Sequence, residues 1–219
     1  MSIKLSCRLQ AVADCVPVGA RIIDVGTDHA MIPVWLIQTE RVAHAWASDI
    51  RPGPLQSARR LIGETECEDN ISLRLTNGLQ GFGPEDGDTV IIAGMGGETM
   101  VNILSEAPWT KKNTLLILEP QSKQALLRTF LLENGYAIER EFLVEDAGRI
   151  YPILLARGGR EEACTPGELH VGRLDRIGGD PLLPDYLDEL MRRLAPAVGH
   201  DPDAAALMAE FKTMKERLL

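Results

Sequence analysis

Short apolar runs alternate with segments of helical periodicity along the first 160 residues, and this alternation constrains the fold more than any other feature of the sequence. Strands that alternate with helices pair in parallel, because each helix carries the chain back to the same edge of the sheet. We therefore expect an α/β fold. The strands are predicted at 21–26, 44–50, 71–78, 88–94 and 113–120, with helices at 2–16, 28–38, 53–63, 97–104 and 123–135.

Two further strand-like runs, 137–147 and 149–158, are separated only by the turn around Asp146-Ala147-Gly148. Parallel neighbours need a crossover of a dozen or more residues, so these two strands must form an antiparallel hairpin. Five strand–helix units followed by a hairpin predict a Rossmann-like, doubly wound sheet that is mostly parallel, with an antiparallel edge hairpin.

The character of the sequence changes near Arg157, where RGGREEACTPG is typical of a linker. Two helical patterns follow, each with four apolar residues on one face, and they predict a helical hairpin packed on itself or on the sheet. We expect a first domain over 1–160 and a small C-terminal helical domain over 161–219. The apolar faces comprise Leu183, Leu187, Leu190 and Leu194, then Leu207, Phe211, Met214 and Leu218.

Composition limits the location and partners of the chain. The longest apolar runs are strand-sized and the opening MSIKLSCRLQ is unlike a secretory signal, so we expect a cytoplasmic protein outside the membrane. The four cysteines are scattered without a CxxC pair, and we expect no bound metal. The net charge of −9 weighs against a nucleic-acid partner, although residues 1–60 carry a small basic excess. The sequence does not fix the oligomeric state, and a monomer is favoured.

The polar ends of four predicted strands indicate a ligand site, because ligands of open α/β sheets bind outside the carboxyl ends of the strands. Gly26 allows close backbone approach, and the N-terminus of the next helix would offer N–H groups to a carboxylate. Asp24 could face an ammonium, Asp49 could accept ribose hydroxyls, and Asn77 could pair with an adenine edge. The four endings are DVGTDH (24–29), SDI (48–50), TNG (76–78) and AGMGG (93–97).

Two cofactors could occupy such a site. A dinucleotide requires a G-x-G-x-x-G turn for its pyrophosphate, and the first strand is followed by Gly26 alone. S-adenosylmethionine carries no phosphate and needs no such turn. The sequence therefore favours S-adenosylmethionine over NAD.

Several segments resemble the bacterial tRNA (adenine-N1)-methyltransferases that modify adenine 22. They include LSCRLQAVADCVPVGARIIDVGTDHAMIPVWL, the GP…SA stretch at 53–58, IAGMGGETMVNIL ending at Leu104, and LEPQSKQALLRTFLLENGY at 118–136. The tyrosine-containing last strand fits the same family, and the resemblance covers about residues 5–156. It implies a class I methyltransferase sheet with a C-terminal helical domain, acting on tRNA with S-adenosylmethionine as methyl donor.

The resemblance also implies roles for individual positions. Asp24, Gly26, Thr27, Asp28 and His29 would form the donor-binding turn, Asp49 would bind the ribose, Asn77 and Gly78 would lie beside the donor's adenine, and Gly94 and Met95 would lie where the methyl group meets its target. Asp28 matches the residue expected to guide the transfer.

Alternatives stay open from the residues alone. Asp28 could instead be a helix N-cap. His29 is better explained by packing or hydrogen bonding than as a base, since adenine N1 attacks without losing a proton. The function could also be methylation of a protein or small molecule, or donor or tRNA binding without catalysis.

Overall fold

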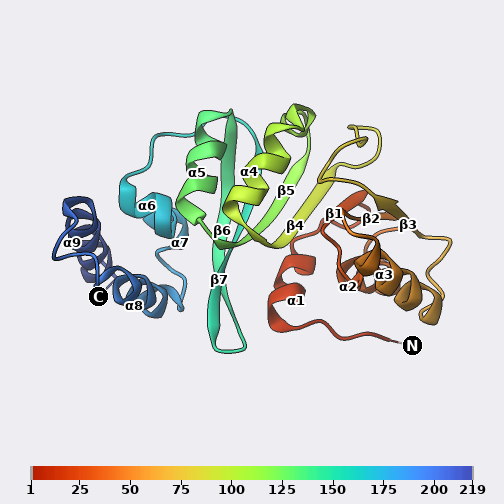
Figure 1. Ribbon diagram of the computed structural model, residues 1–219, viewed down its shortest axis with the longest axis horizontal. Helices are drawn as coiled ribbons and strands as arrows, with labels where there is room; N and C mark the ends of the chain where they lie inside the picture. Colours follow the sequence, from red (N-terminus) through yellow and green to blue (C-terminus); the bar gives the residue numbers. More distant parts are fainter. Residues whose placement is uncertain (1, 219) are drawn as a thin grey trace.

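The computed structural model describes residues 2–218, which form a seven-stranded sheet with helices on both faces (Figure 1). The strand order is β3-β2-β1-β4-β5-β7-β6, in which β1 to β5 are parallel and β7 runs antiparallel between β5 and β6. This confirms the predicted mixed sheet. The strands are β1 Ile22–Val25, β2 Ala45–Asp49, β3 Ile71–Leu75, β4 Thr89–Gly96, β5 Leu115–Ser122, β6 Tyr136–Asp146 and β7 Arg149–Gly158.

Alternate residues of each central strand pack against different helix layers, as the period of two in a strand requires. Ile22 and Ile91 belong to the core beneath α1 (Cys7–Asp14), α2 (Met31–Gln38) and α3 (Pro52–Glu64). Their neighbours Ile23 and Ile92 belong to the opposite core, beneath α4 (Gly97–Ser105), the 3-10 helix Pro108–Lys111 and α5 (Gln124–Glu133). The sheet is therefore buried on both sides, and the carboxyl ends of its parallel strands remain open at one edge.

Two local expectations need correction. The helix expected at 2–16 begins only at Cys7 and ends at Asp14, so residues 2–6 are not helical. The helix expected at 28–38 begins at Met31, after a cap at Ala30 in the left-handed conformation with φ of 57°. Asp28 is therefore not the N-cap of α2. Pro33 does lie in the first turn, where its missing N–H costs no helical hydrogen bond.

The C-terminal segment contains the two predicted long helices, α8 (Leu183–Leu194) and α9 (Pro202–Glu216), preceded by the short helices α6 (Pro166–Val171) and α7 (Leu174–Ile177). The predicted apolar faces of α8 and α9 join a third core. Leu143 of β6 belongs to this core and Ile150 of β7 packs against it. The C-terminal helices therefore pack both on one another and on the edge hairpin.

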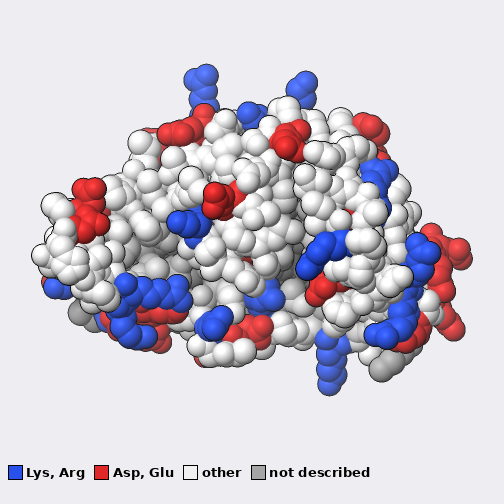
Figure 2. Space-filling view, in the orientation of Figure 1, with Lys and Arg blue, Asp and Glu red and all other residues white. Residues whose placement is uncertain are grey.

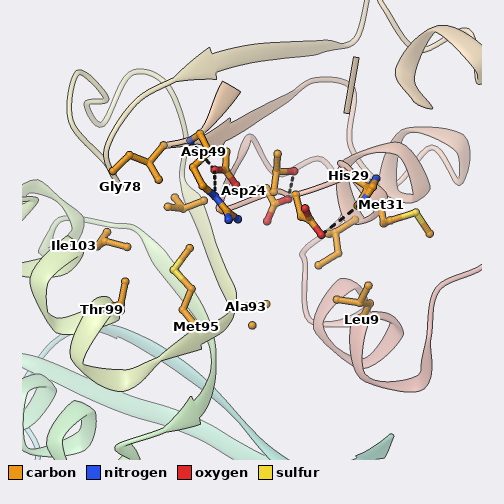
Figure 3. Close-up of a pocket in the computed structure, with 18 of the residues that line it drawn as sticks. Leu9, Asp24, His29, Met31, Asp49, Gly78, Ala93, Met95, Thr99 and Ile103 are labelled. Atoms are coloured by element: carbon orange, nitrogen blue, oxygen red, sulfur yellow. Dashed lines mark hydrogen bonds and ion pairs between the residues drawn. The ribbon is translucent and has the colours of Figure 1, made fainter. Parts of the chain in front are cut away.

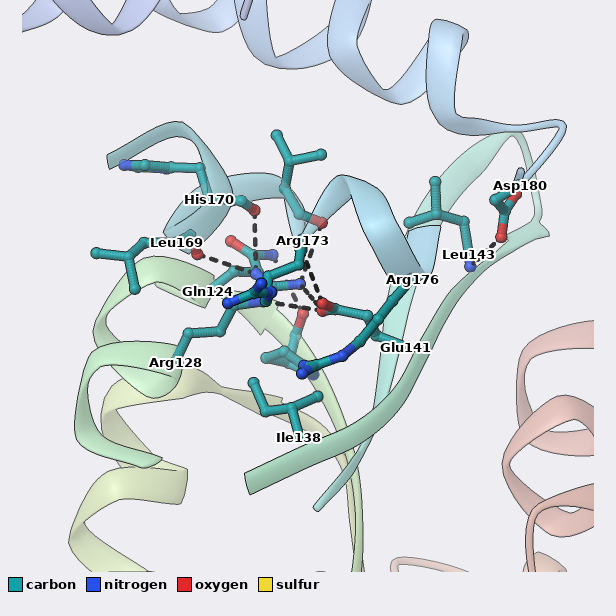
Figure 4. Close-up of polar contacts among 12 residues, drawn as sticks. Gln124, Arg128, Ile138, Glu141, Leu143, Leu169, His170, Arg173, Arg176 and Asp180 are labelled. Carbon is teal, nitrogen blue, oxygen red and sulfur yellow. Dashed lines mark hydrogen bonds and ion pairs between the residues drawn. The ribbon is translucent and has the colours of Figure 1, made fainter. Parts of the chain in front are cut away.

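A buried ion pair joins these helices to the sheet (Figure 4). Arg128 of α5 donates to Glu141 Oε2 of β6 at 3.0 and 3.1 Å, and both side chains are 1% exposed. Arg128 also donates to the carbonyl oxygens of residues 169, 170 and 171, the last of α6. Glu141 Oε1 accepts the backbone N–H of Arg173. The buried ion pair thus supplies hydrogen-bond partners for the backbone carbonyl groups at the C-terminal end of α6 and for the backbone N–H group of Arg173 beyond it.

Candidate functional site

A cavity of about 600 Å³ lies at the carboxyl ends of the parallel strands, around the point where the strand order reverses between β1 and β4. Every predicted site residue lines it: Asp24, Gly26, Thr27, Asp28, His29, Asp49, Asn77, Gly78, Gly94 and Met95. Figure 3 shows Leu9 and Met31 on one side of this cavity and Thr99 and Ile103 of α4 on the other. Residues from the first and second halves of the sheet thus meet in one site.

Asp24 is a buried carboxyl at the end of β1. Its Oδ2 accepts a hydrogen bond from Thr27 Oγ1 at 2.5 Å, and the side chain of Asp49 lies near enough to repel its charge. Burial raises the pKa of Asp24 to about 7, and the Thr27 hydrogen bond only partly opposes this shift. A cation placed beside Asp24 would favour its ionised form.

The turn after β1 is shaped by Gly26, whose φ of 72° is unfavourable for residues with a side chain. The N–H groups of Gly26 and Thr27 both donate to the carbonyl oxygen of Ser48, at 2.8 and 2.9 Å. These two amides are therefore not available to a ligand carboxylate. Since α2 begins only at Met31, the expected placement of its N-terminus directly after Gly26 is wrong.

Asp28 and His29 lie together at the mouth of the cavity. Asp28 Oδ2 and His29 Nε2 are 3.7 Å apart, and the two side chains are 66% and 53% exposed. Asp28 has a φ of 53°, a conformation that aspartate and asparagine tolerate better than most residues. With the capping role removed, nothing in the backbone of α2 requires a carboxylate at position 28.

Asp49 and Asn77 end the next two strands. Asp49 is buried, and its Oδ1 accepts the backbone N–H of Arg51 at 2.9 Å. Asn77 is exposed beside Gly78, where a Cβ would lie 2.8 Å from Ile103 Cγ1 of α4. The absence of a side chain at Gly78 therefore keeps this end of the cavity open. Both polar residues line the cavity, because parallel strands end at the same edge of the sheet.

The glycine-rich segment predicted as a turn after the fourth strand is a β-bulge within β4 in the structure. Gly94 has a φ of 79°, and the pairing register with β5 shifts between Ala93 and Met95 and again between Met95 and Gly96. Its N–H donates to Glu119 Oε2 of β5 at 2.8 Å. Met95 turns back toward Gly26, so the bulge of β4 and the turn of β1 form one continuous wall.

Arg8 of α1 and Gln121 of β5 are among the polar residues of the cavity wall that sequence reasoning missed. Arg8 belongs to an amphipathic helix, where an arginine is ordinarily read as a solvated charge. Gln121 directly follows the predicted fifth strand, 113–120. The carboxyl end of that strand was not included among the polar endings. Extending the same rule to that strand would have identified Gln121.

The lining chemistry fits S-adenosylmethionine. Two buried carboxyls, Asp24 and Asp49, suit an ammonium group and a pair of ribose hydroxyls, and Asn77 offers both a donor and an acceptor. Among residues 2–218 no three histidine, cysteine or acidic side chains group as metal ligands would, and no helix has the length and apolar character needed to cross a membrane.

The fold and this site define a class of protein. Residues 5–154 match the family model described as a methyltransferase domain, so the chain is a member of the methyltransferase-domain family. A Streptococcus pneumoniae candidate tRNA (m1A22) methyltransferase, solved in complex with S-adenosyl-L-methionine, is 29% identical with a TM-score of 0.89. That match covers 97% of this chain and 100% of the other.

The comparisons narrow the family further. The tRNA (adenine(22)-N(1))-methyltransferase of Bacillus subtilis is 35% identical over 167 residues, which cover 75% of this chain and 70% of that relative. The crystal structure of the B. subtilis m1A22 tRNA methyltransferase has a TM-score of 0.83 at 26% identity, over 99% of this chain and 98% of the other. The chain belongs to the tRNA (adenine(22)-N(1))-methyltransferase family, which confirms the resemblance found in the sequence.

Proposed function

We propose that the protein transfers the methyl group of S-adenosylmethionine to N1 of adenine 22 in tRNA. The observation that carries this proposal is the convergence of Asp24, Asp49, Asn77 and the Gly94 bulge on one cavity, in a chain 35% identical to an enzyme named for that reaction. A tRNA substrate would place the activity in the cytoplasm.

The donor would be held by residues of the β1, β2 and β3 ends. Asp24 would face the ammonium, Asp49 would accept the ribose hydroxyls, and Asn77 with Gly78 would flank the adenine. When bound, S-adenosylmethionine supplies a methyl group on a sulfonium, which needs no further activation. The chain's remaining task is placement in a site shielded from water.

The target adenine would enter between Asp28 and the Gly94–Met95 bulge. N1 lies on the Watson–Crick edge, so the base must be unpaired or drawn out of its stack. Asp28 would accept a hydrogen bond from the exocyclic amine, which orients N1 and offsets the positive charge that methylation places on the ring. Adenine N1 carries no proton that must be removed, so His29 would not act as a base. It would pack beside Asp28.

Phosphate contacts would come from basic residues outside the cavity. Figure 2 shows basic side chains over α8, which carries Arg192 and Arg193 in its last turn. Adjacent arginines also lie on α3, at Arg59 and Arg60. If these arginines bind phosphates, charge reversal of either pair should weaken tRNA binding and reduce its salt dependence. Parental salt dependence in both variants would exclude this docking surface.

Mapping methyl groups in unmodified tRNA tests the proposal directly. N1-methyladenine cannot pair on its Watson–Crick edge, so reverse transcription should stop at position 22 after incubation with enzyme and donor. Transcripts carrying guanine at position 22 are the matched control and should show neither the stop nor incorporation of labelled methyl groups. Donor binding with methylation elsewhere in tRNA, or in no tRNA, would overturn the assignment.

A further inference from the structure

Three elements meet at one buried carboxyl that the proposed reaction does not use. Glu119, within β5, is 0% exposed. Its Oε2 accepts Arg8 Nη1 of α1 at 2.5 Å and the N–H of Gly94 at 2.8 Å. Its Oε1 has no hydrogen-bond partner within residues 2–218. Burial raises the pKa of Glu119, and the charge of Arg8 is the largest opposing influence. Arg8 therefore favours the ionised form of Glu119, in which the hydrogen bond from the Gly94 N–H is charge-assisted and stronger.

Arg8 also contacts the edge hairpin. Its guanidinium carbon lies 5.4 Å from the centre of the Tyr151 ring, and its Nε lies 3.9 Å from Asp146 Oδ2. Figure 1 shows the β6–β7 hairpin extending beside α1, and α1 packs against β6. The side chain is only 19% exposed, yet it lines the cavity. Arg8 thus connects the bulge of β4 to the hairpin across the cavity wall.

The charges around Arg8 argue against a phosphate contact. One guanidinium faces two carboxyls, Glu119 and Asp146, so this wall carries no excess positive charge. A phosphate would be repelled by the acidic pair, whereas a neutral base that becomes positive on methylation would not be. Arg8 therefore stabilises the contacts between α1, β5 and the hairpin. The part of the cavity wall that it forms is suited to an uncharged adenine base.

We propose that Arg8 is a positioning residue for the target base: through Glu119 it fixes the Gly94–Met95 bulge, and with the hairpin it forms the wall against which the base lies. This inference rests on the proposed function, since it assigns the base side of the same cavity. Gly94 is in the left-handed conformation and Met95 reaches Gly26, so release of the Gly94 N–H would let both residues move.

Arg8→Gln, Arg8→Lys and Glu119→Gln test the inference, with Arg21→Gln as the matched control. Arg21 pairs with Asp88 at 3.5 Å at the opposite edge of the sheet. Arg8→Gln should slow single-turnover methylation at saturating tRNA about 100-fold, which is the scale of rate loss when a reacting group is misplaced by about 1 Å. The KM for tRNA and the affinity for the donor should stay within about threefold of the parental values. Arg8→Lys should recover most of the rate because it keeps the charge beside Glu119. Arg21→Gln should match the parent.

A second readout does not depend on the substrate. In protein labelled with 13C at the methionine methyl groups, the Met95 resonance of the donor complex should shift in Arg8→Gln and Glu119→Gln but not in Arg21→Gln. An unshifted resonance would overturn the inference even if no tRNA were methylated. If the resonance shifts but the parent protein methylates no tRNA, the proposed function is refuted. The coupling of Arg8 through Glu119 to the Gly94–Met95 bulge would then still stand. Loss of tRNA affinity with an unchanged single-turnover rate would make Arg8 a phosphate contact instead.

Discussion

Gly26 and Met95 are so close that a Cβ added to Gly26 would lie 2.1 Å from Met95 Cε. The two residues end neighbouring strands, β1 and β4, on either side of the point where the strand order reverses. The contact therefore closes the floor of the cavity between its two halves. Because Met95 is flexible at its end, the main cost of a side chain at position 26 is the φ of 72°.

Gly26→Ala should consequently destabilise the protein by about 1–3 kcal/mol, the range for a residue with a side chain held in a strained backbone conformation. It should also weaken donor binding, because Met95 must leave the turn. Thermal unfolding and calorimetric titration measure the two effects. Gly19→Ala is a suitable control, since Gly19 has a φ of 79° with no neighbour within 4 Å of its added Cβ. It should lose stability but keep donor affinity.

Asp49→Ala should weaken S-adenosylmethionine binding by about 1.5–3 kcal/mol, the range for hydrogen bonds to a charged group. The side chain is buried at the end of β2, where its Oδ1 accepts the backbone N–H of Arg51. Calorimetry on the folded variant measures the loss. Asp88→Asn changes an acidic residue at the opposite edge of the sheet and should bind the donor normally. Unchanged donor affinity in Asp49→Ala would refute the ribose assignment.

Donor affinity should depend on pH through Asp24. Its pKa of about 7 means that the carboxyl is largely protonated at pH 6 and ionised at pH 8. Only the ionised form attracts an ammonium, so affinity should fall as pH drops below 7, by up to about tenfold per unit. Binding near pH 6 should release a proton, seen as a calorimetric enthalpy that varies with the buffer. Asp24→Asn should bind weakly at every pH between 5.5 and 7.5 and release none.

The same shift affects folding with the opposite sign. In the folded state the Asp24 carboxyl keeps its proton up to about pH 7, whereas in the unfolded chain it loses the proton near its ordinary pKa of 3.8. Between these values the folded state binds more protons, so the contribution of Asp24 to stability falls as pH rises from 4 to 7. Asp24→Asn removes this dependence. A parent and variant with parallel stability profiles would show that Asp24 titrates normally.

The sequence predicted the side of the cavity formed by the ends of β1, β2 and β3, because that side depends on topology. Asp24, Asp49 and Asn77 follow strands whose order could be read from the alternation of elements, and parallel strands end at the same edge. The base side depends on contacts between distant residues. Arg8 and Glu119 are 111 residues apart, and nothing local to either indicates the other.

The conformation of the turn before α2 could not be predicted from the sequence either. The left-handed residues Asp28 and Ala30 delay α2, and no glycine or asparagine marks either position. The predicted helical hairpin was found, but its attachment through Arg128 was not. A lone arginine in a helical pattern is usually solvated, and only the fold shows that it is buried against Glu141.

The Arg128–Glu141 pair should contribute to stability more than to donor binding. Arg128→Met leaves Glu141 buried without its partner and three carbonyl oxygens of α6 without a donor, which should cost about 3–5 kcal/mol. Arg157→Met breaks an exposed pair with Glu139 and should cost under about 1 kcal/mol. Urea unfolding compares the two variants. Equal losses would show that burial of the pair is unimportant.

Asp28 places a carboxylate at the mouth of the cavity. Asp28→Asn keeps the size of the side chain and tolerates the φ of 53°, so melting temperature and donor affinity should stay near those of the parent. If the carboxylate orients the adenine amine and offsets the charge formed on the ring, turnover should fall about a hundredfold or more. Single-turnover methylation of tRNA measures this. Asp69→Asn is the matched control, because Asp69 is an exposed aspartate that does not line the cavity, and this variant should match the parent. An Asn variant that methylates at close to the parental rate would leave Asp28 without a role in the transfer, since the structure has already removed its role as a cap.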